Sequence, residues 1–130
     1  MPENDLPALR RKAQEFEDDG FFLKALALYK WLLRLEPDAL DLRIKVVELC
    51  QELGLKSDAL GYLHSIARHH AKTGDSRRMR ETLQKMVELE PENIAVRLQL
   101  MESYARDGMA EEAGQELEKI GGQLPRGPRN

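Results

Sequence analysis

The sequence predicts an all-α protein, built as an antiparallel helical-hairpin array of about seven helices. Three observations support this prediction. The chain repeats itself at an offset of 54 residues, glycine and proline mark the ends of its segments, and apolar residues within the segments recur about every 3.6 residues. No stretch alternates apolar and polar residues convincingly, so a β-sheet is not expected.

The internal repeat is the strongest of these observations, because repeat architectures are read from self-similarity at a fixed period. The offset of 54 residues places Leu35-Glu36-Pro37 on Leu89-Glu90-Pro91. It also pairs identical residues along most of the chain: Leu9/Leu63, Ala13/Ala67, Gly20/Gly74, Arg43/Arg97, Glu48/Glu102, Gly54/Gly108, Ala59/Ala113 and Ile66/Ile120.

Glycine and proline divide each repeat into three helices. In chain order the punctuating residues are Gly20, Pro37 and Gly54, then Gly74, Pro91 and Gly108, and the last helix ends before Gly121. The predicted helices span residues 6–19, 21–36, 39–53, 57–73, 76–90, 92–107 and 110–120. Side-chain N-caps are expected from Asp38, Ser57, Asp75 and Asn93. The short connections make successive helices antiparallel neighbours.

The predicted domain organisation is simple. A short flexible N-terminus spans residues 1–5, a single helical domain with the 54-residue repeat spans 6–120, and a disordered tail spans 121–130, where three glycines and two prolines occur. With 42% hydrophobic and 33% charged residues, the chain has enough apolar side chains for a core. It has neither a membrane-spanning apolar run nor a secretory signal, so no membrane insertion is expected. Together with the lone Cys50, this favours a cytoplasmic location.

Three segments share one order of apolar, small, aromatic and glycine positions. The clearest contains Leu9, Ala13, Phe16, Gly20, Phe22, Ala25, Tyr29, Leu32 and Pro37, and looser copies begin at Leu63 and Leu100. This order resembles the tetratricopeptide repeat (TPR) family, whose unit is two antiparallel helices in about 34 residues. The resemblance covers roughly residues 6–120. It implies a TPR-like α-solenoid in which each hairpin packs against its neighbours.

No constellation for catalysis is present, since the sequence lacks a phosphate-binding glycine loop, a zinc-protease helix motif, a nucleophile elbow and a calcium loop. The protein is therefore not expected to be an enzyme and needs no cofactor. His64, His69 and His70 with Cys50 do not predict a metal site, because His64 and His69 lie about 140° apart on a helix. His70 is expected to be a packing residue.

Basic residues gather in the fourth and fifth predicted helices: Arg68, Lys72, Arg77, Arg78, Arg80 and Lys85, against only Asp75 and Glu81. Acidic residues dominate from Glu88 to Glu118. Such a distribution can steer an acidic protein or peptide, although a plain solvated helix surface is the alternative. Nucleic acid is not expected, because the net charge is -3 and no aromatic residues interleave the cluster.

The second predicted helix has an unusual exposed side. Lys24, Lys30 and Arg34 define a narrow polar stripe into which Leu23 and Trp31 fall. Tryptophan beside cationic side chains is typical of binding hot spots, and a second copy of the chain is one such partner. The alternative is that Trp31 lies flat against a neighbouring helix with its N–H in water.

In the TPR family, a well-known mode of peptide binding clamps a terminal carboxylate between Lys, Arg and Asn. The matching groove positions here are Arg10 and Gln14, then Ile44, Lys45 and Glu48. Because Glu48 and a missing Asn break this pattern, a carboxylate clamp is not expected.

The leading hypothesis is a non-catalytic adaptor or scaffold that binds a protein or peptide on its helical surface. The candidate contacts are Arg10, Gln14, Glu17, Leu23, Trp31, Arg68, Arg77 and Arg78. The alternative hypothesis is a structural module for self-association.

Overall fold

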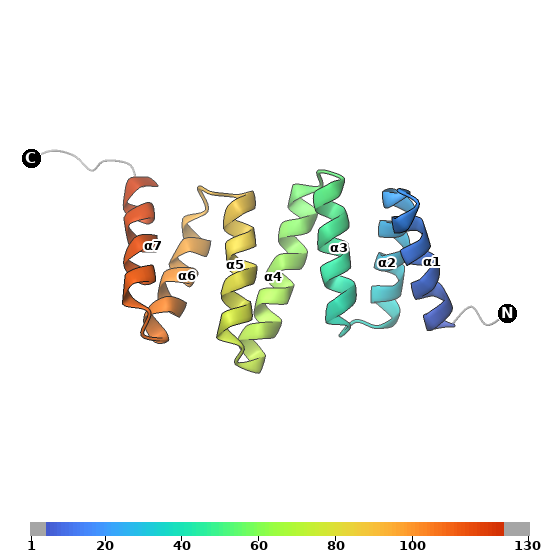
Figure 1. Ribbon diagram of the computed structural model, residues 1–130. Helices are drawn as coiled ribbons and strands as arrows, with labels where there is room; N and C mark the ends of the chain where they lie inside the picture. The colour runs from blue at the N-terminus through green and yellow to red at the C-terminus, as the bar shows by residue number, and fades with distance from the viewer. Residues whose placement is uncertain (1–4, 124–130) are drawn as a thin grey trace, which may run out of the picture. The chain divides into compact units, whose positions relative to one another are not determined.

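The computed structural model describes residues 5–123 of the chain, which contain seven helices and no strand. The helices are α1 (Leu6–Asp18), α2 (Phe22–Leu35), α3 (Leu40–Glu52), α4 (Lys56–Thr73), α5 (Ser76–Leu89), α6 (Ile94–Arg106) and α7 (Ala110–Gln123) (Figure 1). The all-α prediction is confirmed. Among the described residues, no helix is both long and apolar enough to cross a membrane.

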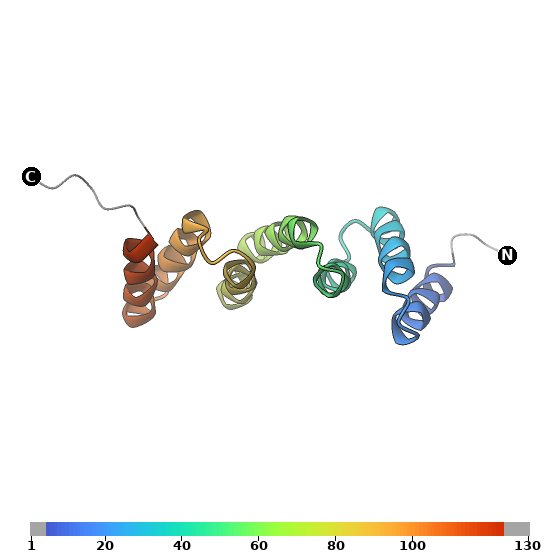
Figure 2. The same cartoon turned by 90° about the horizontal axis from the view of Figure 1, so that it is seen from above.

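The described part of the chain divides into two compact units, and the division falls between Ile66 and Ala67, inside α4. In the first unit, α1 packs against α2 and α2 packs against α3. In the second unit, α5 packs against α6 and α6 packs against α7. Both views show these neighbours side by side (Figure 2). Each unit therefore consists of helices that fold back on the helix just before them in sequence.

Four helices end at a glycine in the left-handed region, as the sequence predicts. The φ angles of Gly20, Gly54, Gly74 and Gly108 are 79°, 72°, 75° and 74°. After each glycine, the next N–H donates back to a carbonyl of the preceding helix, for example from Phe21 to Phe16 at 2.8 Å and from Asp75 to His70 at 2.9 Å. The 54-residue repeat thus repeats a turn geometry as well as a sequence.

Two of the four predicted caps are confirmed. Asp75 accepts the N–H of Arg78 at 3.1 Å, and Asn93 accepts the N–H of Val96 at 3.2 Å. The prediction for Asp38 was wrong, because Ala39 occupies the N-cap position of α3 and makes no side-chain bond. The prediction for Ser57 was also wrong, because α4 already begins at Lys56.

The last helix is longer than expected. It continues to Gln123, three residues beyond the predicted end at residue 120. Ile120 is buried, and the side-chain nitrogen of Gln123 donates to the carbonyl of Pro91 at 2.6 Å, which holds this end of α7 to the segment before α6. Residues 121–123 of the predicted disordered tail are therefore helical. Its residues 124–130, like residues 1–4 of the predicted flexible N-terminus, lie outside the described residues.

The core is made of small and apolar residues that recur with the repeat. Ala13, Ala25 and Ala59 are completely buried, which lets helix backbones approach closely. Leu32 of α2 and its repeat equivalent Met86 of α5 are also completely buried. Cys50 lies in the core, where burial raises the pKa of its thiol. Leu32 and Met86 thus occupy the same core position in the two units.

Candidate functional site

The first unit contains a groove between α1 and α3, which we call the α1/α3 groove. It has a volume of 340 Å³. Its lining residues are Arg10 and Gln14 of α1, Tyr29 of α2, and Asp41, Leu42, Ile44 and Lys45 of α3. The structure therefore brings Arg10 and Gln14 together with Ile44 and Lys45, which the sequence placed in matching groove positions.

Helix periodicity explains how these side chains meet. Arg10 and Gln14 are one turn apart on α1, and Asp41 lies one turn before Ile44 and Lys45 on α3. Tyr29 reaches the groove from α2 and is only 3% exposed. Ile44 is 39% exposed and gives the groove its accessible apolar surface.

The cations of the groove are paired with acidic side chains. Arg10 contacts Glu36 at 2.9 Å and Asp41 at 2.6 Å. The hydrogen bond between Arg10 and Asp41 raises the pKa of the guanidinium and lowers the pKa of the carboxyl. Lys45 lies 3.3 Å from Glu17 and 3.9 Å from Glu48. Two of these ion pairs, Arg10–Asp41 and Lys45–Glu17, join side chains of α1 to side chains of α3.

Tyr29 connects the core to this charged rim. Its hydroxyl donates to Glu17 Oε1 at 3.3 Å and approaches Gln14 Oε1 at 3.5 Å. Burial, followed by the negative charge of Glu17, raises the pKa of Tyr29 from 10.0 to about 12. The candidate residue Glu17 thus contacts both Tyr29 and Lys45 at the edge of the groove.

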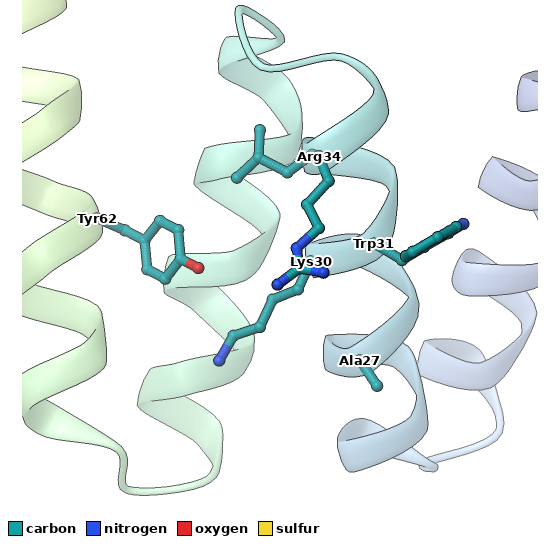
Figure 3. A pocket seen from close by; sticks show the side chains of 6 residues that line it. Ala27, Lys30, Trp31, Arg34 and Tyr62 are labelled. Atoms are coloured by element: carbon teal, nitrogen blue, oxygen red, sulfur yellow. The ribbon is translucent and has the colours of Figure 1, made fainter.

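A second pocket lies in the first unit between α2 and α4, and we call it the α2 pocket. Its volume is 330 Å³, and its lining includes Lys30, Trp31, Arg34 and Tyr62. Lys30 extends from α2 toward the side of Tyr62, the indole of Trp31 points away from Tyr62, and Arg34 lies in front of α2 between them in this view (Figure 3). Lys30 also pairs with Asp58 at 3.4 Å.

The predicted exposed side of α2 is present. Trp31 is 50% exposed and Leu23 is 69% exposed, and Arg34 lies on the same side. Half of the Trp31 surface is thus open to solvent.

The predicted basic cluster does not form one uniform patch. Arg80 has a side chain only 12% exposed, and it binds Asp107 at 2.5 Å and Ser103 at 3.0 Å, which ties α5 to α6. Arg77 and Arg78 are exposed and pair with Glu81 at 3.2 Å and Asp75 at 3.6 Å. Arg68 is exposed on α4, and none of the ion pairs among residues 5–123 involves it.

His70 is buried, as expected for a packing residue. His70 is 7% exposed, and its ring lies edge-on to that of His69, with centroids 5.4 Å apart. Burial, followed by the charge of His69, lowers the pKa of His70. Across the part of the chain that the structure describes, no group of three or more His, Cys, Asp or Glu side chains is arranged to hold a metal ion.

Sequence reasoning did not find the buried ion pair of the second unit. Arg97 and Glu116 lie 3.4 Å apart, with side chains 10% and 8% exposed. Arg97 also donates to the carbonyl of Pro91 at 3.0 Å, and Arg43 donates to that of Pro37 at 2.7 Å. The sequence carries a signal for these contacts, because an arginine, Arg43 or Arg97, recurs six residues after the proline of each Leu-Glu-Pro. Both arginines hold that proline's carbonyl, which is a structural role.

No family model and no curated protein matches this sequence. Solved structures do match. A mutant of MamA is 14% identical with a TM-score of 0.50, covering 95% of this chain and 77% of that one. MamA from Desulfovibrio magneticus RS-1 is 18% identical with a TM-score of 0.48, covering 93% and 76%. YrrB, described as a TPR protein with an unusual peptide-binding site, is 18% identical with a TM-score of 0.47, covering 94% and 70%. Helices that recur with the 54-residue repeat, joined at left-handed glycines, show that the chain has a TPR-like fold.

Proposed function

We propose that this chain is a non-catalytic adaptor or scaffold that holds a segment of a partner protein in the α1/α3 groove. The observation that carries the proposal is the exposed Ile44, set beside Tyr29 in a groove whose polar groups are held in place by ion pairs. Three packed helices supply the side chains of this groove, so the surface is formed before a partner arrives, which limits the entropy lost on binding. We place this function in the cytoplasm, where the unpaired thiol of Cys50 stays reduced.

The charges of the groove indicate the chemistry of the partner. Arg10 and Lys45 are already neutralised by Glu36, Asp41, Glu17 and Glu48. A free carboxylate therefore gains little here, in agreement with the broken clamp pattern. Carboxylates outnumber cations around the groove, so the best-matched segment places an apolar side chain on Ile44 and a basic side chain at the rim.

Selection from a displayed peptide library tests this proposal. The purified chain should enrich peptides with an apolar residue next to Lys or Arg. Ile44→Asp should weaken the selected peptides at least tenfold, about 1.4 kcal/mol. Leu98→Asp is the matched control, because Leu98 is the repeat equivalent of Ile44 and the two are 38% and 39% exposed. Absence of enrichment, or equal loss in both variants, would contradict the proposal.

We propose Arg77 and Arg78 of α5, together with Arg68 of α4, as candidate contacts for a second, acidic partner of the same scaffold. The pairs made by Arg77 and Arg78 are exposed and therefore weak, so both side chains are available to an acidic partner. The double variant Arg77→Glu, Arg78→Glu should reduce the association rate with an acidic peptide and flatten its salt dependence. Stopped-flow measurements at two salt concentrations check this, and an unchanged rate would remove the cluster from the proposal.

A further inference from the structure

One side of α7 carries an exposed leucine whose equivalent on α4 is buried. Leu117 is 56% exposed, whereas its repeat equivalent Leu63 is 2% exposed. Around Leu117 lie the exposed residues Glu111, Gly114 and Glu118, and the opposite side of α7 carries the buried Glu116 and Ile120. We call the four exposed residues, Glu111, Gly114, Leu117 and Glu118, the α7 face.

The first unit has an exposed helix side of opposite charge. Leu23, Lys24, Trp31 and Arg34 of α2 are all exposed and lie on one side of the helix, which we call the α2 face. Its two apolar residues are the most exposed large apolar side chains of α2, at 69% and 50%. Large exposed apolar surfaces framed by polar residues are typical of interaction sites.

The two helices complement each other in charge. Within α2 there are three basic residues, Lys24, Lys30 and Arg34, and no acidic one. The charged residues of the α7 face are Glu111 and Glu118, whereas Glu116 is buried and pairs with Arg97. Lys30 already contacts Asp58 at 3.4 Å, so the positive charge of the α2 face comes from Lys24 and Arg34.

We infer that the α2 face of one copy of this chain binds the α7 face of a second copy. Pairing two α2 faces brings cations against cations, and pairing two α7 faces brings carboxylates against carboxylates, both of which cost energy. Only the α2-to-α7 arrangement places opposite charges together and also covers Leu23, Trp31 and Leu117. This surface is separate from the α1/α3 groove, so the inference does not depend on the proposed function.

Such an interface is head-to-tail, because the two surfaces that meet are different. Every copy that joins leaves one α2 face and one α7 face free at the ends of the assembly. The mass of the assembly should therefore rise continuously with protein concentration rather than stop at a dimer, unless the chain of copies closes into a ring. Salt should reduce it, because exposed charges are screened.

Sedimentation velocity of the full chain and two blocked variants tests the inference. The α2-blocked variant is Trp31→Ala with Arg34→Glu, and the α7-blocked variant is Leu117→Ala with Glu118→Lys. Each should weaken self-association at least about tenfold. Mixed together, the two variants should form a 1:1 heterodimer and nothing larger, because each still carries one intact face. Leu98→Ala with Glu102→Lys on α6 is the matched control and should assemble like the natural chain.

Three results would overturn the inference. The first is a natural chain that stays monomeric at all concentrations. The second is an α7-blocked variant that still dimerises, which would indicate an interface made by two α2 faces. The third is the absence of a heterodimer in the mixture when circular dichroism shows that both variants are folded. All four substituted residues are exposed, so the variants should keep the helical content of the natural chain.

Discussion

Tyr29 is the residue at which the core and the proposed groove meet. Its ring is buried with the helices of the first unit, and its hydroxyl touches the acidic rim through Glu17. Both surroundings favour the neutral phenol, because burial and a nearby negative charge oppose ionisation. One side chain therefore stabilises the hairpin and sets the polarity of the groove floor.

The raised pKa of Tyr29 predicts a pH effect on stability. The folded state holds the pKa at about 12 and the unfolded state at about 10, so the neutral phenol stabilises the fold below pH 10. This contribution is lost as the pH rises through 12. Between these values the free energy of unfolding of the natural chain should fall more steeply than that of Tyr29→Phe, as measured by urea denaturation. Parallel curves would show that Tyr29 ionises as it does in water.

At the scale of the elements, the glycines were the most informative residues in the sequence. Gly20, Gly54, Gly74 and Gly108 fixed where helices end, because each adopts a backbone geometry that other residues avoid. The caps were less predictable, since Asp38 has the right chemistry yet Ala39 takes the N-cap position. A one-residue shift of that kind is set by packing rather than by local propensity.

The candidate site, too, was predictable from the sequence only in part. The resemblance to the TPR family gave Arg10, Gln14, Ile44 and Lys45 as groove positions, and these four residues line one groove in the structure. The pairing of Arg10 with Glu36 and Asp41 was not predictable, because Glu36 lies at the end of a different helix and the contact depends on how α1, α2 and α3 pack. The ion pair between Arg80 and Asp107 was not predictable either, because it depends on how α5 packs against α6.

Two glycine substitutions should have opposite effects on stability. Gly20→Ala forces a side chain into the left-handed region at φ 79° and should cost about 1–2 kcal/mol. Gly61→Ala lies within α4, where an added Cβ meets nothing within 4 Å, and should stabilise the protein by about 0.4–1 kcal/mol. Urea denaturation of both variants checks the signs. A loss of stability in Gly61→Ala would contradict the helical geometry of α4.

At the scale of the whole molecule, the chain has two compact units whose sequences are related by the 54-residue repeat. In each unit, the packing joins helices that follow one another in sequence. A fold of this kind has few contacts between distant parts of the chain, so its stability is approximately a sum of local terms. Local unfolding of one unit is then possible without unfolding of the other.

A matched pair of core substitutions tests this independence. Leu32 in the first unit and Met86 in the second are repeat equivalents, and both are completely buried. Replacing either with Ala should cost about 2–5 kcal/mol. If the terms are local, Leu32→Ala should accelerate amide hydrogen exchange mainly in α1–α3, and Met86→Ala mainly in α5–α7. Equal acceleration throughout residues 5–123 in both variants would instead show that the chain opens as one cooperative unit. A substitution in either unit would then lower the free energy of opening of both units by the same amount.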